Sequence, residues 1–104
     1  MKKLTQKVTR AESDLGEFIS SWRRLLGLTA AQVANRADIA PSTYSKIENG
    51  SLNVSTESFL SVCSSLGILD KLLDALDPYN SDLGRIRADQ ALPKRIRQKK
   101  TALS

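Results

Sequence analysis

The chain has 104 residues with one cysteine and no histidine, and its 16 basic and 11 acidic residues give a formal net charge of +5. This length fits one domain, the single cysteine excludes an internal disulfide framework, and the lack of histidine excludes His-based metal sites and His-dependent catalysis. No apolar run approaches the roughly 20 residues of a membrane span, so we expect no membrane contact. The basic excess suits a polyanionic partner. The single cysteine is consistent with a reducing cytoplasm, and we expect neither a cofactor nor a metal.

The positive charge is concentrated near the two ends of the chain. Residues 1–10 carry four basic and no acidic residues, and residues 85–104 carry seven basic residues and one acidic residue. Such segments are either arms that reach phosphate or an acidic protein surface, or simply solvated tails. We therefore divide the chain into a basic N-terminal arm at 1–12, a domain at 13–77 and a C-terminal extension at 78–104.

A first helix is predicted from about Ser13 to Leu26. A broad apolar stripe supports it: Leu15, Phe18, Ile19, Trp22, Leu25 and Leu26. Ser13 can cap this helix, but Thr9 with Glu12 can form an earlier capping box, so its start stays open by about one turn. Gly27 ends the helix.

The segment from 29 to 50 predicts two short helices joined by a tight turn. Asp38 lies where the chain needs a left-handed residue, and Asp tolerates that conformation better than most residues. Pro41 then restarts a helix at its first position, and the Asn49-Gly50 pair ends it. Apolar residues keep helical spacing on both sides of the break: Val33, Ala37, Ile39, Tyr44 and Ile47.

This pattern predicts a DNA-binding helix-turn-helix whose second helix lies in the major groove. The side chains left outward on that helix are short hydroxyls and one cation, which suit base edges and phosphates. With the capping residue and first residue of the preceding helix, they form the expected DNA-contacting set: Thr29, Ala30, Pro41, Ser42, Thr43, Ser45, Lys46 and Asn49. For Asn49, a pure helix-capping role is the alternative.

Two further helices complete an all-α, five-helix bundle. The fourth is predicted from Thr56 to Leu66, with Ser55 as its cap and Gly67 at its end. Its inward residues are expected to be Phe59, Leu60, Val62, Cys63 and Leu66. The fifth, over 69–76, is expected to close the bundle and to stop before Pro78.

The runs WRRLLGLT, VANRADI, STYSKIENG and LSVCSSLG resemble the Xre class of bacterial regulators, which includes Cro and lambda repressor, over roughly residues 14–77. The resemblance implies a lambda-repressor-like fold and a buried ion pair between Arg23 and Glu48. Two positions depart from the family pattern. Ala30 stands where the family often has a glutamine that touches phosphate, and Ala40 stands where it favours a Ser or Thr cap.

Beyond Pro78 the pattern changes. Residues 79–97 combine turn formers with the short alternating pieces GRIR and KRIR, which leaves weak strands, an extended arm or a short helix ended by Pro93 as alternatives. The segment has too few apolar residues to fold alone, yet it has more of them than a tail that contacts nothing would need. We expect contact with a second copy or another protein through Leu83, Ile86, Leu92 and Ile96.

The acidic fifth helix with the runs LDALDP and GRIRADQALPKRIR resembles the small Xre-type antitoxins, HipB-like, whose partners are HipA-type serine/threonine kinase toxins. The resemblance implies a homodimeric repressor that binds its own double-stranded DNA operator and holds the kinase toxin in a complex. A stand-alone regulator, such as a phage repressor or a restriction controller, is the alternative. A non-DNA interaction module is disfavoured by Lys46 and the basic flanks, and an enzyme is least expected.

Overall fold

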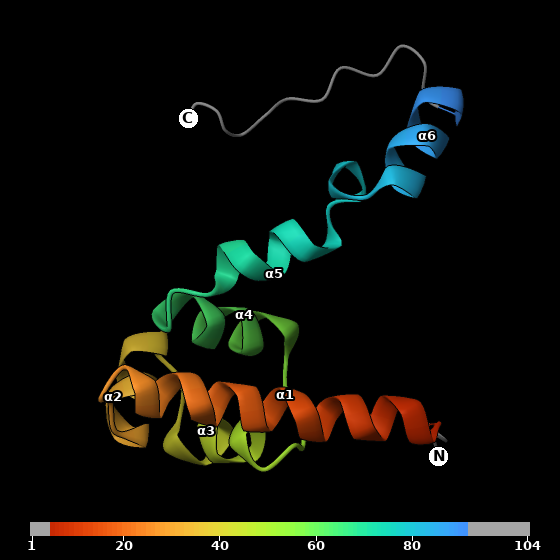
Figure 1. Cartoon of the computed structure of the whole chain (residues 1–104). Coiled ribbons are helices and arrows are strands. Elements are labelled where there is room, and N and C mark those ends of the chain that lie inside the picture. The colour runs from red at the N-terminus through yellow and green to blue at the C-terminus, as the bar shows by residue number, and fades with distance from the viewer. Residues whose placement is uncertain (1–4, 92–104) are drawn as a thin grey trace. The chain divides into compact units, whose positions relative to one another are not determined.

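The computed structural model describes residues 5–91 (Figure 1). Within this range the chain forms α-helices and one 3-10 helix and has no strand, which confirms the all-α class. The elements are α1 (Gln6–Leu25), α2 (Ala30–Ala37), α3 (Pro41–Glu48), α4 (Thr56–Ser65), α5 (Leu69–Leu76), η1 (Pro78–Asn80) and α6 (Asp82–Ala91). Two compact units are present, the first ending at Asp70 and the second beginning at Lys71.

The first unit has its core where α1 to α4 meet. Helix α2 packs against α3 and α4, and α3 also packs against α1. The buried residues are almost all apolar: Ile19, Val33, Ala34, Ala37, Tyr44, Ile47, Val62, Cys63 and Leu66. Removing these side chains from water drives the packing, with roughly 1.5–3 kcal/mol for each large aliphatic residue.

Helix α1 begins two turns before the predicted start at Ser13. Thr5 is its N-cap, and the Thr5 hydroxyl oxygen accepts a hydrogen bond from the Val8 backbone N–H at 3.1 Å. The prediction was wrong because Ser13 and the Thr9–Glu12 pair offered caps of the same kind closer to the apolar stripe. Lys7 and the following residues, expected in an N-terminal arm, are therefore helical, while residues 1–4 lie outside the described range.

The predicted apolar stripe of α1 is only partly buried. Ile19 lies in the core with 2% of its surface exposed, whereas Phe18 is 57% exposed and Leu25 is 79% exposed. Trp22, expected in the core, is half-buried. The helix thus has one face against the first unit's core and a second apolar face that the first unit does not cover.

The helix-turn-helix has the predicted turn chemistry. Thr29 and Gln32 form a capping box at the start of α2, in which each side chain accepts a hydrogen bond from the other residue's backbone N–H, at 3.0 and 2.8 Å. Asp38 adopts the left-handed conformation with φ 57° and ψ 46°. Pro41 is the first residue of α3, and Asn49 is its C-cap. The predictions for Thr29 as a cap and for Asp38, Pro41 and Asn49 are confirmed, whereas the part of Gln32 in the capping box was not predicted.

Gly16 lets α1 approach the end of α3 backbone to backbone. A Cβ atom at this position would lie 2.7 Å from the Ile47 carbonyl oxygen and 2.8 Å from the Glu48 carbonyl oxygen. A side chain of any size would separate the two helices. On the other side of this contact, Gly50 has φ +81° and approaches the Ser13 backbone.

Helix α4 begins at the predicted residue and ends at Ser65, one residue before the predicted end at Leu66. The Ser55 hydroxyl oxygen accepts a hydrogen bond from the Ser58 backbone N–H at 3.0 Å, and Gly67 follows the helix with φ +75°. Val62, Cys63 and Leu66 are buried, while Phe59 and Leu60 are half-buried. Burial raises the pKa of the Cys63 thiol, which fits a core residue rather than a reactive one.

The second unit contains η1 and α6, which pack together. The contact is close because Gly84 has no side chain, and a Cβ there would lie 2.1 Å from the Pro78 carbonyl oxygen. Arg85 donates a hydrogen bond to the Tyr79 carbonyl oxygen at 2.8 Å and pairs with Asp82. Of the alternatives for this segment, the short helix is therefore the one observed, up to residue 91.

Helix α5 has the predicted bounds, but none of its residues is buried. Leu73 is 52% exposed and Leu76 is 72% exposed. Its expected role in closing the bundle stays a prediction.

Candidate nucleic-acid interface

Helix α3 presents one polar stripe to solvent and one apolar face to the core. Ser42, Ser45, Lys46 and Asn49 follow the i, i+3, i+4, i+7 spacing of a single helix face, and all four are exposed. The opposite face buries Tyr44 and Ile47, which are 1% and 0% exposed. We call the four exposed residues the α3 stripe. Two anchored side chains beneath it fix the direction in which the stripe points.

The remaining predicted DNA-contacting residues lie at the starts of α2 and α3. Pro41, Thr29 and Ala30 are exposed, whereas Thr43 is half-buried at the edge of the α3 stripe. Ala40 is the N-cap of α3 and makes no side-chain hydrogen bond. The first backbone N–H groups of α3 therefore have no side-chain cap, and such groups attract anions.

Beneath the stripe, Arg23 of α1 and Glu48 of α3 form an ion pair. The Arg23 Nε donates to Glu48 Oε2 at 2.6 Å, and a second Arg23 nitrogen, Nη2, donates to Glu48 Oε1 at 3.3 Å. Each side chain is 16% exposed, so the pair is partly rather than fully buried. The two-pronged geometry suits a guanidinium–carboxylate pair and orients both groups.

Two further hydrogen bonds enlarge this pair into a network, here called the Glu48 network. The Tyr44 hydroxyl donates to Glu48 Oε2 at 2.5 Å, and Arg23 Nη1 donates to the Leu28 carbonyl oxygen at 3.0 Å. Leu28 directly precedes Thr29, the cap of α2. The network thus joins α1, the start of α2 and α3, the three segments whose mutual positions set the proposed contact surface.

The electrostatics keep the Glu48 network charged at neutral pH. Burial alone would raise the pKa of Glu48, but the hydrogen bonds from Arg23 and Tyr44 outweigh it, and the pKa is lowered. Burial, together with the hydrogen bond to Glu48, raises the pKa of the Tyr44 phenol. The hydrogen bond to Glu48 raises the pKa of Arg23. At neutral pH the Glu48 carboxylate is therefore ionised, the Tyr44 phenol is neutral and the Arg23 guanidinium is cationic, as the hydrogen bonds of the network require.

Sequence reasoning placed Tyr44 inward as a core residue but missed its hydroxyl as a hydrogen-bond donor. The available signal was its spacing from Glu48, because residues four apart lie on the same helix face. Gly16 was also missed, since nothing in its local sequence marks a close helix–helix approach.

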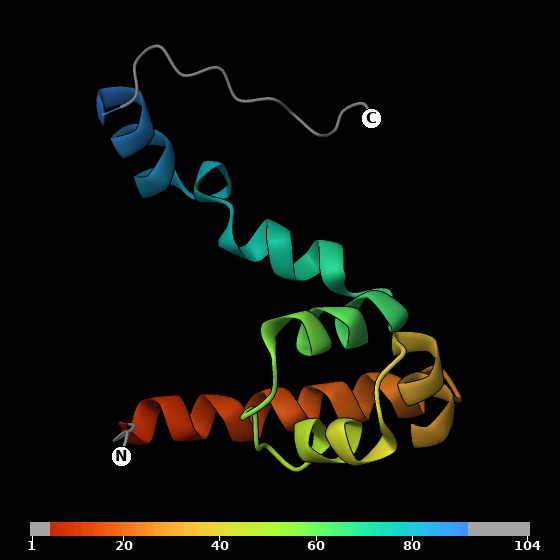
Figure 2. The same ribbon diagram turned by 180° about the vertical axis from the view of Figure 1, so that it is seen from behind.

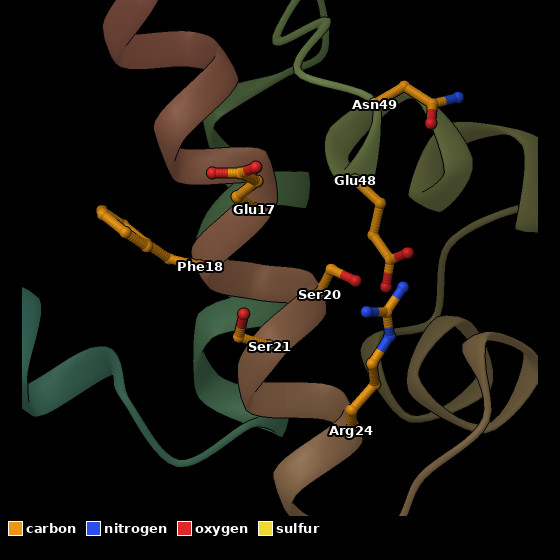
Figure 3. Close-up of a pocket in the computed structure, with 7 residues that line it drawn as sticks. All are labelled: Glu17, Phe18, Ser20, Ser21, Arg24, Glu48 and Asn49. Atoms are coloured by element: carbon orange, nitrogen blue, oxygen red, sulfur yellow. The ribbon is translucent and has the colours of Figure 1, made fainter.

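A pocket of about 550 Å³ lies between α1 and the end of α3 (Figure 3). Its lining is mainly polar: Glu17, Phe18, Ser20, Ser21, Arg24, Glu48 and Asn49. Figure 3 shows the Arg24 side chain extending toward Glu48, whereas Phe18 points away from Glu48 and Asn49. The nearby Arg24 charge contributes to the lowered pKa of Glu48. The pocket therefore adjoins the network that supports α3.

Residues 5–91 offer no group of three or more potential metal ligands. In the same range no helix is both long and apolar enough to cross a membrane.

The C-terminal contact residues are brought together only in part. Leu83 and Ile86 lie three residues apart on α6 and are 63% and 55% exposed. Leu92 and Ile96, predicted to act with them, lie outside the described residues. Helix α6 thus presents two neighbouring apolar side chains to solvent.

Comparison with known protein families agrees with the geometry of the first unit. The family described as a helix-turn-helix domain matches residues 14–76, which is more than half of the chain. The match covers α2, the turn at Asp38 and α3, with most of α1 before them and α4 and α5 after them. No curated protein and no solved structure matches the chain.

Proposed function

We propose that this chain, which belongs to the helix-turn-helix domain family and through it to proteins that bind DNA, represses transcription by recognising a specific operator. The observation that carries the proposal is the α3 stripe, which is exposed along one face of a helix whose opposite face is buried. A helix held in this way can enter the major groove without losing its orientation.

The roles of the individual residues follow from their chemistry. Lys46 is long enough to reach a base edge or a phosphate, and the Ser42 and Ser45 hydroxyls can donate to or accept from base edges. Asn49, at the C-terminal end of the stripe, is proposed to contact the DNA backbone. Thr29, Ala30, Pro41 and Thr43, beside the stripe, are proposed to do the same. Backbone contacts set the register of the protein on DNA, while contacts to bases select the sequence.

The operator is proposed to be palindromic and bound by a homodimer. Two copies related by a two-fold axis place two recognition helices in successive major grooves on one side of the duplex, roughly 34 Å apart. Selection of bound sequences from random duplexes is the direct experiment. We expect an inverted repeat whose half-sites are centred about one helical turn apart, and selection that enriches no sequence would contradict the proposal.

A finer proposal concerns the antitoxin role. We propose that residues 78–104 hold a HipA-like kinase, so that one protein both represses its own gene and neutralises the toxin. The support is the sequence resemblance of the segment after 69, together with the exposed Leu83 and Ile86 on α6. The alternative is a stand-alone regulator without a toxin partner.

Co-expression with any neighbouring reading frame for a kinase distinguishes these two roles. The antitoxin role predicts that the tagged chain purifies with the kinase and that Leu83→Glu/Ile86→Glu loses it while operator binding is kept. A chain that binds its operator but never retains such a kinase would be a stand-alone regulator.

A further inference from the structure

One face of α1 has the residue spacing of a helix that pairs with another helix. Six uncharged residues recur at alternating intervals of three and four: Val8, Ala11, Leu15, Phe18, Trp22 and Leu25. We call this set the α1 seam. The interval pattern is that of the a and d positions of a heptad repeat, and all charged residues of α1 lie off it.

Much of the α1 seam is exposed. Val8 is 44% exposed, Phe18 57% and Leu25 79%, and Ala11 is also exposed, while Leu15 and Trp22 are half-buried. Burial on α1 is instead concentrated at Gly16 and Ile19, on the face that meets the core. The helix therefore has two separate packing faces, of which the first unit occupies one.

Helix α1 is also longer than the first unit requires. Its contact with the end of α3 begins near Ser13, and residues 5–11 are all exposed. Both views of the chain show the N-terminal turns of α1 extending past α2, α3 and α4 (Figures 1 and 2). The extension precedes the matched family segment, which begins at residue 14. Val8 and Ala11 continue the seam along this extension, which gives two otherwise unsupported turns a reason to be helical.

We infer that the α1 seam binds the α1 seam of a second copy, with the two helices antiparallel. A two-fold axis midway between Leu15 and Phe18 sets Leu15 of each copy against Phe18 of the other. The same axis sets Ala11 against Trp22 and Val8 against Leu25. The largest side chain then meets the smallest, as dense packing requires. A parallel pair would instead set Trp22 against Trp22 and Ala11 against Ala11, with one crowded layer and one gap.

The area of such a contact is that of a small interface between two copies. Large side chains that are about half exposed contribute on the order of 100 Å² each. Three seam residues are of this kind, Val8, Phe18 and Leu25, so they bury roughly 300 Å² per copy and about 600 Å² in total, and the half-buried Leu15 and Trp22 add less each. The contact therefore belongs to the small, weak class of protein–protein interfaces.

The α1 seam leaves the proposed DNA-contacting surface open. Phe18, at the centre of the seam, points away from Asn49 of the α3 stripe (Figure 3). The inference supplies a surface for the homodimer in the proposed function, but its test needs only the protein and so stands apart from DNA binding.

Sedimentation of the full chain over a range of concentrations is the first test. We expect a dimer whose dissociation constant rises by at least about 30-fold in Phe18→Glu/Leu25→Glu, because two apolar side chains central to the contact are lost. The matched control is Leu83→Glu/Ile86→Glu, which makes the same chemical change on α6 and should dimerise like the parent. Circular dichroism checks that each variant remains helical.

Cysteine cross-linking tests the direction of the helices. The antiparallel arrangement predicts that Val8→Cys mixed with Leu25→Cys forms a mixed disulfide dimer, whereas Val8→Cys alone does not. The parent contains only the buried Cys63, so its cross-linking under the same conditions gives the background level. The inference would be overturned by any of four results. In sedimentation these are a monomeric parent, a seam variant that dimerises like the parent, or an α6 control that no longer dimerises. In cross-linking it is a disulfide dimer formed by Val8→Cys alone.

Discussion

Glu48 is the residue through which most of the support for α3 passes. Its carboxylate accepts hydrogen bonds from Arg23 and from Tyr44, and Arg23 extends the connection to the Leu28 carbonyl oxygen. None of these side chains belongs to the α3 stripe. Loss of Glu48 is therefore expected to weaken DNA binding indirectly, through the position of the helix that carries the stripe.

The lowered pKa of Glu48 makes part of the stability depend on pH. Its folded-state pKa lies below the unfolded-state value of about 4.3, so the network stabilises the fold above that pH and is lost as the pH falls through the folded value. At pH 7, Glu48→Gln is expected to lower the free energy of unfolding by about 1.5–3 kcal/mol, the scale of hydrogen bonds to a charged group.

Urea unfolding at pH 7 and below the folded-state pKa of Glu48 measures this effect. Between the two pH values, Glu48→Gln should lose less stability than the parent does. The matched control is Glu57→Gln in the first turn of α4, where the carboxylate is exposed and lies outside the Glu48 network. Equal losses of stability in Glu48→Gln and the parent would show that the ion pair contributes nothing.

At the scale of elements, the contact between α1 and α3 depends on the absence of a side chain at Gly16. In an open helix, replacing glycine with alanine stabilises by about 1 kcal/mol. At Gly16 the new Cβ would meet two carbonyl oxygens of α3 at less than 3 Å, so the helices must move apart.

Gly16→Ala is therefore expected to destabilise the first unit by about 1–3 kcal/mol. Ser21→Ala, an exposed change on the same helix, should be close to neutral. Chemical denaturation of both variants provides the measurement. A Gly16→Ala variant more stable than the parent would mean that the backbone approach is looser than described.

The elements also show which features can be predicted from sequence. The turn at Asp38, the start of α3 at Pro41 and the cap at Ser55 were predictable because each depends on a residue and its immediate neighbours. The start of α1 was misplaced because several hydroxyl residues near it can cap a helix. Gly16 and the Tyr44 hydroxyl were missed because their roles arise from segments that come together only in the fold.

The candidate site followed the same division. The outward direction of the α3 stripe was predictable from helical periodicity, and the ion pair from the family resemblance. Periodicity alone did not show that Thr43 lies half-buried at the edge of the stripe. The exposed face of α1 was also not predictable, because an apolar stripe on a helix looks alike whether it meets the core or a second copy.

For the whole molecule, the two surfaces proposed for protein contacts lie on separate elements. The α1 seam is assigned to the second copy, and α6 with the segment after it to another protein. Truncation after Pro78 should therefore leave a folded, dimeric bundle that has lost kinase capture. It should also bind the operator more weakly, because seven basic residues are removed with only two acidic residues.

Sedimentation, gel-shift and pull-down assays on the truncated chain separate these effects. A lower salt dependence of operator binding is expected, since fewer phosphates are neutralised. If residues 1–78 dimerise, bind the operator and retain the kinase as well as the full chain does, the extension is only a solvated tail. If they become monomeric, the dimer contact lies in the extension and not on α1.

The account depends above all on α3 being the element that reads DNA, and operator binding by Lys46→Ala tests this most directly. We expect a loss of about 1–3 kcal/mol if Lys46 contacts a base, or a similar loss on all sequences with a salt slope lower by about one if it contacts phosphate. Lys71→Ala on α5, which removes the same charge, should bind the operator nearly as the parent does. Unchanged operator binding by Lys46→Ala and by the Ser42→Ala/Ser45→Ala double variant would contradict the account.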